Sequence, residues 1–274
     1  MAYTQQIAVI NMGVDGLTGT RNVGLIKDTN LLVAENISFE RGMISREGGS
    51  AKFNSTAISG TPSVIGGFDW WPDDSTQRSV VCTSAGTLLK DTGSGTYSVT
   101  LKTGLSGSGM PVFVEGGKEA AINNRKLFIV NGIDPVQVLS GDGITTTNLL
   151  APPADWTGTN HPSTIANHDN RMIMAGNKND PHRVYYSSVA DHETFTGADT
   201  GTIAVYPGQG GIITGLLSFR GLIIVWKTKG VFVIDSTDPN IANWRVKRIS
   251  DAVGMLNPQS FAIIDNDIIY QNAN

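Results

Sequence analysis

The sequence predicts an all-β fold, and three observations carry this prediction. Three β-rich runs follow one another within Ile212–Ser236, separated by the short breaks Arg220-Gly221 and Lys227–Gly230. Val, Ile, Phe and Trp favour half-buried strands, and glycine-containing breaks of this length are typical of hairpin connections. The pattern recurs along the chain, and glycine supplies 32 of 274 residues, as in a turn-rich protein. We therefore expect antiparallel meanders, with no helix of ordinary length between the runs.

The second run of the meander recurs at a nearly constant spacing. Equivalent runs begin beside Arg78, Arg125, Arg171, Gly221 and Asp267, at spacings of 46 to 50 residues. A period of this size with several strands per unit is typical of β-propeller blades, which span about 40–50 residues each. The sequence thus predicts β-propeller-like repeats over residues 60–274, with the last blade incomplete. An irregular β-sandwich with similar loop lengths is the alternative.

Residues 1–59 stand apart from the repeats and are predicted to form an N-terminal arm. A short helix is expected over Asp28–Ile37. Ile37 and Phe39 then alternate with polar residues, Arg41-Gly42 suits a turn, and Met43-Ile44 starts a second strand, so a hairpin is expected. The residues do not distinguish a solvated edge hairpin from an arm that docks on a neighbour.

Composition narrows the possible functions and settings. The formal net charge of −4 argues against a generally basic nucleic-acid binder, although a mildly negative wall suits a passage through which DNA slides. Cys82 is the single cysteine, so no intrachain disulfide is expected and a buried role is favoured. No secretory signal and no run of 18 apolar residues is present, which predicts synthesis in a cytoplasm without a membrane segment.

The segment Ala34–Gly49 has the pattern A-x-N-I-S-F-x-R-G-x-I-x-R-x-G-G. With several later segments it resembles the podophage tail nozzle family, which includes tail tubular protein B and tail stabilisation proteins. Ala34–Gly49 is similar to the N-terminal signature of this family. The residues that carry the motif, and which we expect to serve assembly, are Asn36, Phe39, Arg41, Gly42, Arg46 and Gly48. Further similar segments are Asn124–Asp134, His168–Ser188, Ile213–Ile234 and Ser250–Ser260. Their order and spacing extend the resemblance over most of the chain.

The resemblance implies a structural protein of the virion tail. Family members form a ring, expected to be a hexamer, below the portal and the tail adaptor, and extend the channel through which DNA is ejected. The implied partners are other copies of the chain, the adaptor, other tail proteins and viral DNA that passes without sequence-specific binding. One departure is that the family usually continues well past the strand at Asp267–Tyr270.

Enzyme chemistry is not expected. The four histidines, including the one in His168-Asp169, lack the paired spacing of metal ligands, and Asn and Asp in such loops commonly form turns. Pro207–Gly211 is rich in glycine but lacks the Lys-Ser/Thr of a phosphate-binding loop, so we interpret it as a crossing between blades. No catalytic, metal-binding or cofactor-binding residues are therefore assigned, and no cofactor is expected.

The adjacent pair Trp70 and Trp71 is the remaining candidate for assembly or binding. Neighbouring residues of a strand point to opposite faces, so one ring is expected to pack inward and the other to be more exposed. An exposed tryptophan could anchor a neighbouring subunit or stack on a sugar. The alternative function is accordingly a propeller-type binding module that recognises a host-surface glycan or receptor.

Overall fold

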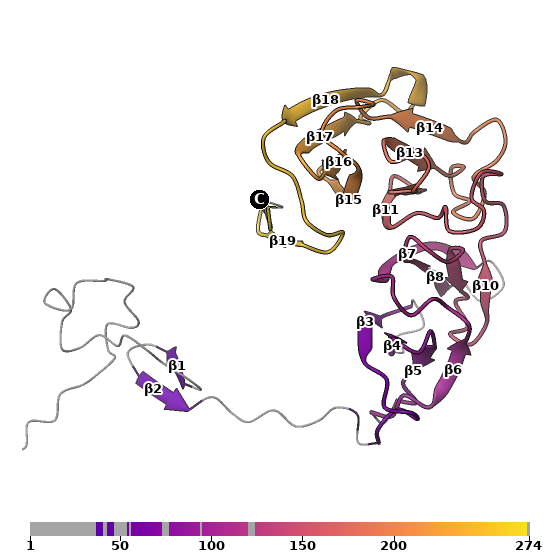
Figure 1. The fold of residues 1–274 in the computed structure, drawn as a ribbon, viewed down its shortest axis with the longest axis vertical. Helices are drawn as coiled ribbons and strands as arrows, with labels where there is room; N and C mark the ends of the chain where they lie inside the picture. The colour runs from indigo at the N-terminus through magenta and orange to yellow at the C-terminus, as the bar shows by residue number, and fades with distance from the viewer. Residues whose placement is uncertain are drawn as a thin grey trace, which may run out of the picture. The chain divides into compact units, whose positions relative to one another are not determined.

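The chain divides into two compact units, Met1–Phe53 and Asn54–Asn274, which are described separately. The sequence places this boundary after Ser59. The computed structural model (Figure 1) describes residues 37–40, 43–46, 54, 56–72, 77–93, 95–119 and 124–272. Within these residues no helix is long and apolar enough to cross a membrane.

The described part of the first unit is a two-stranded hairpin. Strand β1 (Ile37–Glu40) pairs antiparallel with β2 (Met43–Arg46), and Phe39 lies opposite Ile44 in the register. The predicted hairpin is therefore confirmed. The helix expected over Asp28–Ile37 lies outside the described residues, apart from Ile37, which begins β1.

The second unit contains four four-stranded antiparallel sheets, which we call blades one to four. Blade one comprises β3 (Val64–Trp70), β4 (Arg78–Thr83), β5 (Leu88–Lys90) and β6 (Val99–Lys102). Blade two comprises β7 (Val112–Glu119), β8 (Asn124–Val130), β9 (Gln137–Leu139) and β10 (Thr146–Asn148). Blade three comprises β11 (Thr164–His168), β12 (Arg171–Ala175), β13 (Arg183–Tyr186) and β14 (Gly201–Ala204). Blade four comprises β15 (Ile213–Phe219), β16 (Leu222–Lys227), β17 (Gly230–Asp235) and β18 (Arg245–Ser250).

A fifth sheet holds only two strands among the described residues, β19 (Phe261–Ile264) and β20 (Asp267–Tyr270). The sheets follow one another around an arc, and the first strands of neighbouring blades pack together (Figure 1). Strands that pair in chain order within each sheet, with first strands innermost, define a β-propeller. The predicted all-β, β-propeller-like fold class is confirmed.

The blades differ from the predicted meander by a fourth strand. In blade four this strand is β18, which carries Arg245, Lys247 and Arg248 and has no buried residue. The fourth strand of blade two, β10, has the polar sequence Thr-Thr-Asn. Such strands lie at the outer rim, where one face and one edge meet solvent, so they lack the hydrophobic run by which a strand is recognised.

The turns between the first two strands of blades three and four explain the polar residues that precede the second strand there. Asp169 and Asn170 have φ of 44° and 59°, and Arg220 and Gly221 have φ of 51° and 73°. Two consecutive residues with positive φ form the type I′ turn of tight hairpins, which favours Asn, Asp and Gly. These turns set the register of the innermost strand pair in blades three and four.

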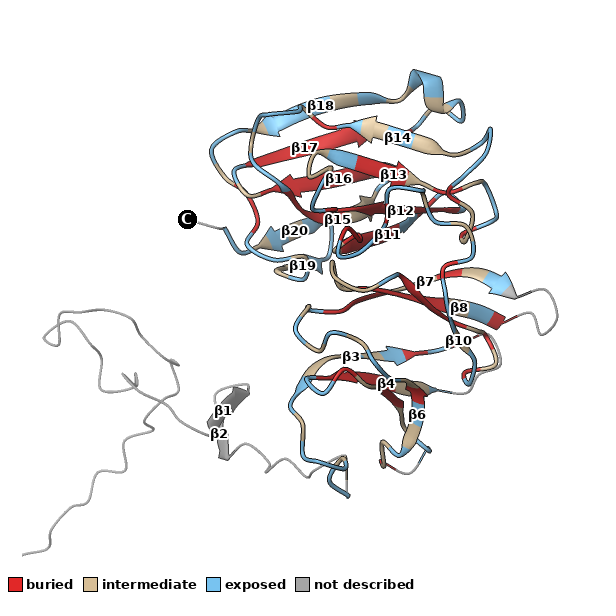
Figure 2. Ribbon diagram, turned by 45° about the vertical axis from the view of Figure 1, so that its right-hand side comes forward, coloured by how far each residue is buried: buried red, intermediate tan, exposed pale blue. Residues whose placement is uncertain are grey.

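Blades two, three and four each pack against a neighbour on both faces. In β8, Leu127 and Ile129 pack into the core between blades one and two, whereas Phe128 and Val130 pack into the core between blades two and three. The same alternation divides β12 and β16 between neighbouring cores. Strands that are buried on both faces have continuous hydrophobic sequences, and Figure 2 shows these central strands as the buried part of the unit.

Cys82 lies in one of these shared cores. It belongs to the core between blades one and two and is only 3% exposed. Burial is the main cause that raises the pKa of its thiol to about 11. The prediction that Cys82 is a buried apolar residue is confirmed, and at neutral pH the thiol remains protonated and unreactive.

Candidate functional sites: a central cavity and an inter-blade pocket

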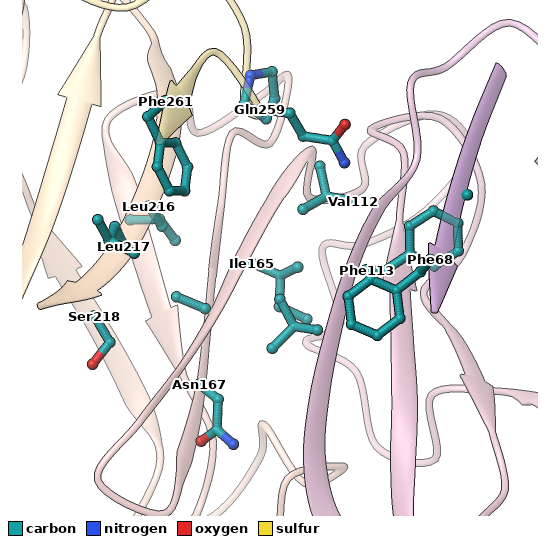
Figure 3. A pocket seen from close by; sticks show the side chains of 14 residues that line it. Phe68, Val112, Phe113, Ile165, Asn167, Leu216, Leu217, Ser218, Gln259 and Phe261 are labelled. Atoms are coloured by element: carbon teal, nitrogen blue, oxygen red, sulfur yellow. The ribbon is translucent and has the colours of Figure 1, made fainter. Parts of the chain in front are cut away.

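The innermost strands line an open cavity of about 440 Å³, which we call the central cavity. Strands β3, β7, β11 and β15 and the segment that leads into β19 line it (Figure 3). Its lining side chains are mainly apolar and include Phe68, Val112, Phe113, Ile165, Leu216, Leu217 and Phe261. The rings of Phe68 and Phe113 stack with centroids 5.8 Å apart and planes 13° apart. The cavity thus has an aromatic wall contributed by blades one and two.

Close packing of neighbouring blades at the cavity depends on a small residue in β3. A Cβ atom at Gly66 would lie 2.5 Å from Cγ of Pro111, which precedes β7. A side chain at this position would force the first strands of blades one and two apart, so glycine is required by close approach and not by an unusual backbone angle.

The polar groups beside the cavity are already used to join blades. Asn167 Nδ2 donates a hydrogen bond of 3.0 Å to the carbonyl of Glu115, from blade three to blade two. Gln259 Nε2 donates one of 2.8 Å to the carbonyl of Pro111, so the segment before β19 is fixed to blade two. The central cavity therefore offers an apolar space of small-molecule size with few free polar groups.

His168 joins blade three to blade four. Its Nδ1 lies 2.8 Å from Ser218 Oγ and its Nε2 lies 2.7 Å from Ser236 Oγ. Asp169 Oδ2 is 3.3 Å from Nε2, but this carboxylate is 69% exposed to solvent. Burial lowers the pKa of His168, which keeps the ring neutral between the two hydroxyls. A serine, a histidine and an aspartate meet here, as in a catalytic triad. The shortest contact on Nε2, however, comes from a serine and not from the aspartate. We interpret the group as a structural link.

Lys227 is fully buried at the end of β16. Its ammonium group donates to the carbonyls of Val205, Tyr206 and Gln209 at 2.6, 3.0 and 2.8 Å. Its Nζ also lies 3.1 Å from His182 Nδ1. Burial lowers its pKa to about 8. Three carbonyl acceptors satisfy the ammonium group without a carboxylate, and they fix the glycine-rich segment 205–211. This segment connects β14 to β15, so its interpretation as an inter-blade crossing is confirmed.

A second hollow, of about 510 Å³, lies where blade three meets the β17–β18 connection of blade four. We call it the inter-blade pocket. Its lining residues are Arg171, Tyr186, Ala198, Asp199, Thr202, Ile203, Pro239, Asn240, Ile241 and Ala242. The two longest connections that contribute to it are residues 187–200, between β13 and β14, and residues 236–244, between β17 and β18.

Arg171 and Asp199 form the fixed base of the inter-blade pocket. Arg171 Nη1 donates to the carbonyls of Ser187 and Asp199 at 2.6 and 2.7 Å, and Nη2 donates to Asp199 Oδ1 at 2.8 Å. The guanidinium also lies 5.6 Å from the centroid of the Tyr186 ring. The backbone N–H of Val189 and the Arg171 guanidinium hold the pKa of Asp199 below its usual range. The pair is therefore ionised and close to neutral overall.

The predicted assembly residues are placed as follows. Trp70 is fully buried and Trp71 is 56% exposed, so the expected division of this pair is confirmed. Phe39 lies in β1 and Arg46 in β2, whereas Asn36, Arg41, Gly42 and Gly48 lie outside the described residues. No group of three or more His, Cys, Asp or Glu side chains that could hold a metal occurs in the part of the chain that the structure describes.

The sequence did not identify the inter-blade pocket. Arg171 marked a repeat, but nothing in its sequence surroundings indicated a binding site. Asp199 and Asn240 lie in two connections that pair across adjacent blades only in the folded chain. The available signal was the length of these two connections, because long loops on a rigid scaffold commonly carry binding residues.

Comparison with known proteins supports the fold. Sqt1 from Saccharomyces cerevisiae is 8% identical, with a TM-score of 0.50 over 82% of this chain and 57% of its own. BamB from Moraxella catarrhalis is 14% identical (TM-score 0.45, covering 82% and 59%), and YCF48 from Cyanidioschyzon merolae is 11% identical (0.43, covering 66% and 59%). The chain thus spans less than two thirds of each of these structures. The similarity to Sqt1, a β-propeller, supports the architecture alone. No protein-family model and no curated protein sequence matches the chain.

Proposed function

We propose that this chain is a non-catalytic, structural subunit of a podophage tail nozzle. In this role, copies of the chain form a ring in the virion tail, and the ring forms part of the wall of the DNA ejection channel. The order and spacing of the family-like motifs along the sequence, from Ala34–Gly49 to Ser250–Ser260, support the proposal. A propeller fold agrees with what the resemblance implies.

The observation that carries the proposal is the outer edge of blade two. Ile144 and Leu150 flank β10 and are 66% and 79% exposed. The strand between them, Thr146–Asn148, has no charged residue. Edge strands of soluble proteins usually carry charge or proline that prevents association, and exposed apolar side chains beside an unprotected edge favour a protein contact. This edge is a suitable subunit interface.

The size of the central cavity constrains how DNA would pass. A volume of about 440 Å³ is that of a small-molecule pocket and is too small for a DNA duplex. The channel would therefore lie between subunits and not along the axis of one propeller. A chain with a formal charge of −4 would bind the passing phosphates weakly, which suits rapid transit.

The first test is the native mass of the purified chain, alone and mixed with the tail adaptor, by native mass spectrometry. A ring, or a monomer that forms one with the adaptor, is expected, with an interface above about 1,000 Å². The variants Ile144→Lys and Leu150→Lys should prevent the ring, whereas Ile212→Lys, at another exposed apolar residue, should not. A chain that remains monomeric with the adaptor would contradict the proposal.

A propeller-type binding module is the second candidate function. The specific observation in its favour is the inter-blade pocket, which is open at the surface and is lined by polar as well as apolar side chains. The two functions are compatible, because assembly would use the outer edge of blade two and binding would use the junction of blades three and four.

A further inference from the structure

Three polar groups at the inter-blade pocket are not used by the fold. The Tyr186 hydroxyl, the Thr202 hydroxyl and the Asn240 amide nitrogen make no hydrogen bond to any described residue, while Asn240 Oδ1 accepts from the N–H of Ala242. Thr202 and Asn240 are exposed and Tyr186 is half-buried. The pocket therefore presents free donors and acceptors around an aromatic ring.

The aromatic ring is held in a fixed position. Tyr186 packs against the core between blades three and four, tilts against Trp244 at a centroid distance of 6.1 Å, and lies beneath the Arg171 guanidinium. A Cβ atom at Gly201 would lie 2.4 Å from Tyr186 Oη. Glycine at this position thus leaves the space into which the tyrosine hydroxyl extends.

The charges at the pocket select the class of ligand. Arg171 is neutralised by Asp199, whose side chain is 54% exposed, so a phosphate or another anion would meet an exposed carboxylate and no free cation. A cation would compete with the Arg171 hydrogen bonds. A neutral ligand with several hydroxyls can instead donate to Asp199 and bind the free hydroxyls and amide, while its C–H face contacts an aromatic ring.

We propose that the inter-blade pocket binds a neutral sugar residue, with Asp199, Thr202 and Asn240 as hydrogen-bonding groups and Tyr186 as the aromatic contact. The volume of about 510 Å³ is within the usual range for ligand pockets. This inference goes beyond the tail-ring proposal and does not depend on it, because the pocket is formed within one chain.

The test is saturation-transfer NMR on the full chain with glucose, galactose, mannose, N-acetylglucosamine and rhamnose, and with glucuronic acid as the charged comparison. At least one neutral sugar should bind at concentrations up to about 10 mM, the weak range expected when few hydrogen bonds are made. Thr202→Val keeps the side-chain shape and removes the free hydroxyl. Asn240→Asp keeps the shape and the acceptor for the Ala242 N–H, and replaces the free NH2 donor with a charged oxygen. Each should weaken binding about tenfold, the equivalent of one good hydrogen bond.

Matched controls separate the site from general effects. Thr100→Val and Asn257→Asp make the same chemical changes at exposed positions outside the pocket and should leave binding unchanged. Gly201→Ala should displace Tyr186 and weaken binding through the aromatic contact. Three results would each overturn the inference. These are no binding by any neutral sugar, Thr202 and Asn240 variants that bind as tightly as the unmodified chain, and glucuronic acid that binds more tightly than the neutral sugars. Because sugar binding is measured directly, a failure of ring assembly would not affect this result.

Discussion

The junction between blades three and four and the junction between blades two and three bury polar groups in opposite ways. At the first, Lys227, His168 and Arg171 are buried, and each hydrogen-bonds to main-chain carbonyls or serine hydroxyls. At the second, His192 is 7% exposed and packs against Phe128, and neither ring nitrogen has a partner among the described residues. A buried polar group stabilises a junction only when its partners are buried with it.

The largest expected effect is at Lys227. Lys227→Met keeps an unbranched side chain but leaves the carbonyls of Val205, Tyr206 and Gln209 without their donor. We expect the free energy of unfolding to fall by about 3 kcal/mol or more, as when one partner of a buried charged group is removed. Urea denaturation measures it. Lys229→Met, at an exposed position in the next turn, is the control and should change stability little. An equal loss in both variants would show that the buried hydrogen bonds are not the cause.

At His192 we expect a substitution to raise stability. His192→Leu replaces a buried ring with two unpartnered nitrogens by an apolar side chain, so stability should rise by about 1 kcal/mol. The midpoint of thermal unfolding should increase accordingly. A decrease would mean that the ring nitrogens are satisfied in solution, for example by a buried water.

A smaller loss is expected at the serines that flank His168. Ser236→Ala removes the hydroxyl 2.7 Å from His168 Nε2 and should cost about 1 kcal/mol. Ser163→Ala is a suitable comparison, because this hydroxyl makes only a longer bond of 3.2 Å to the carbonyl of Gly176. If urea denaturation showed an equal loss of stability in the two variants, the hydrogen bond to His168 would contribute no more than the longer bond of Ser163.

The smallest effect concerns pH. Burial is the main cause that lowers the pKa of His192, so below its unfolded value of about 6.5 the unfolded chain binds a proton that the folded chain does not. Stability is therefore lost as pH falls below this value. Leucine carries no proton, so the advantage of His192→Leu should grow between pH 7 and 5. Urea titrations at several pH values measure the difference in stability between the His192→Leu variant and the unmodified chain. A difference that does not change with pH would contradict a lowered pKa of His192.

The fold was predictable because its signal is local. Central strands such as Leu222–Lys227 are buried on both faces and are therefore continuously hydrophobic, and tight turns such as Arg220-Gly221 mark their ends. The outer strand β18 was missed because a rim strand does not need a hydrophobic run. The sites were not predictable, because Lys227 meets its partners only after adjacent blades have packed, and Asp199 meets Arg171 only after the connection 187–200 has folded back over its own blade. The spacing of residues along the sequence contains no information about either contact.

The sharing of the central strands β8, β12 and β16 between two cores has a consequence for how the chain unfolds. Loss of one blade would expose the apolar faces of both its neighbours, so stability belongs to the junctions and not to single blades. The protein then behaves as a one-dimensional array with nearest-neighbour coupling. Under mechanical tension, blades would peel from an end in sequence, and the polar contacts of Lys227 would act as a stopping point between blades three and four.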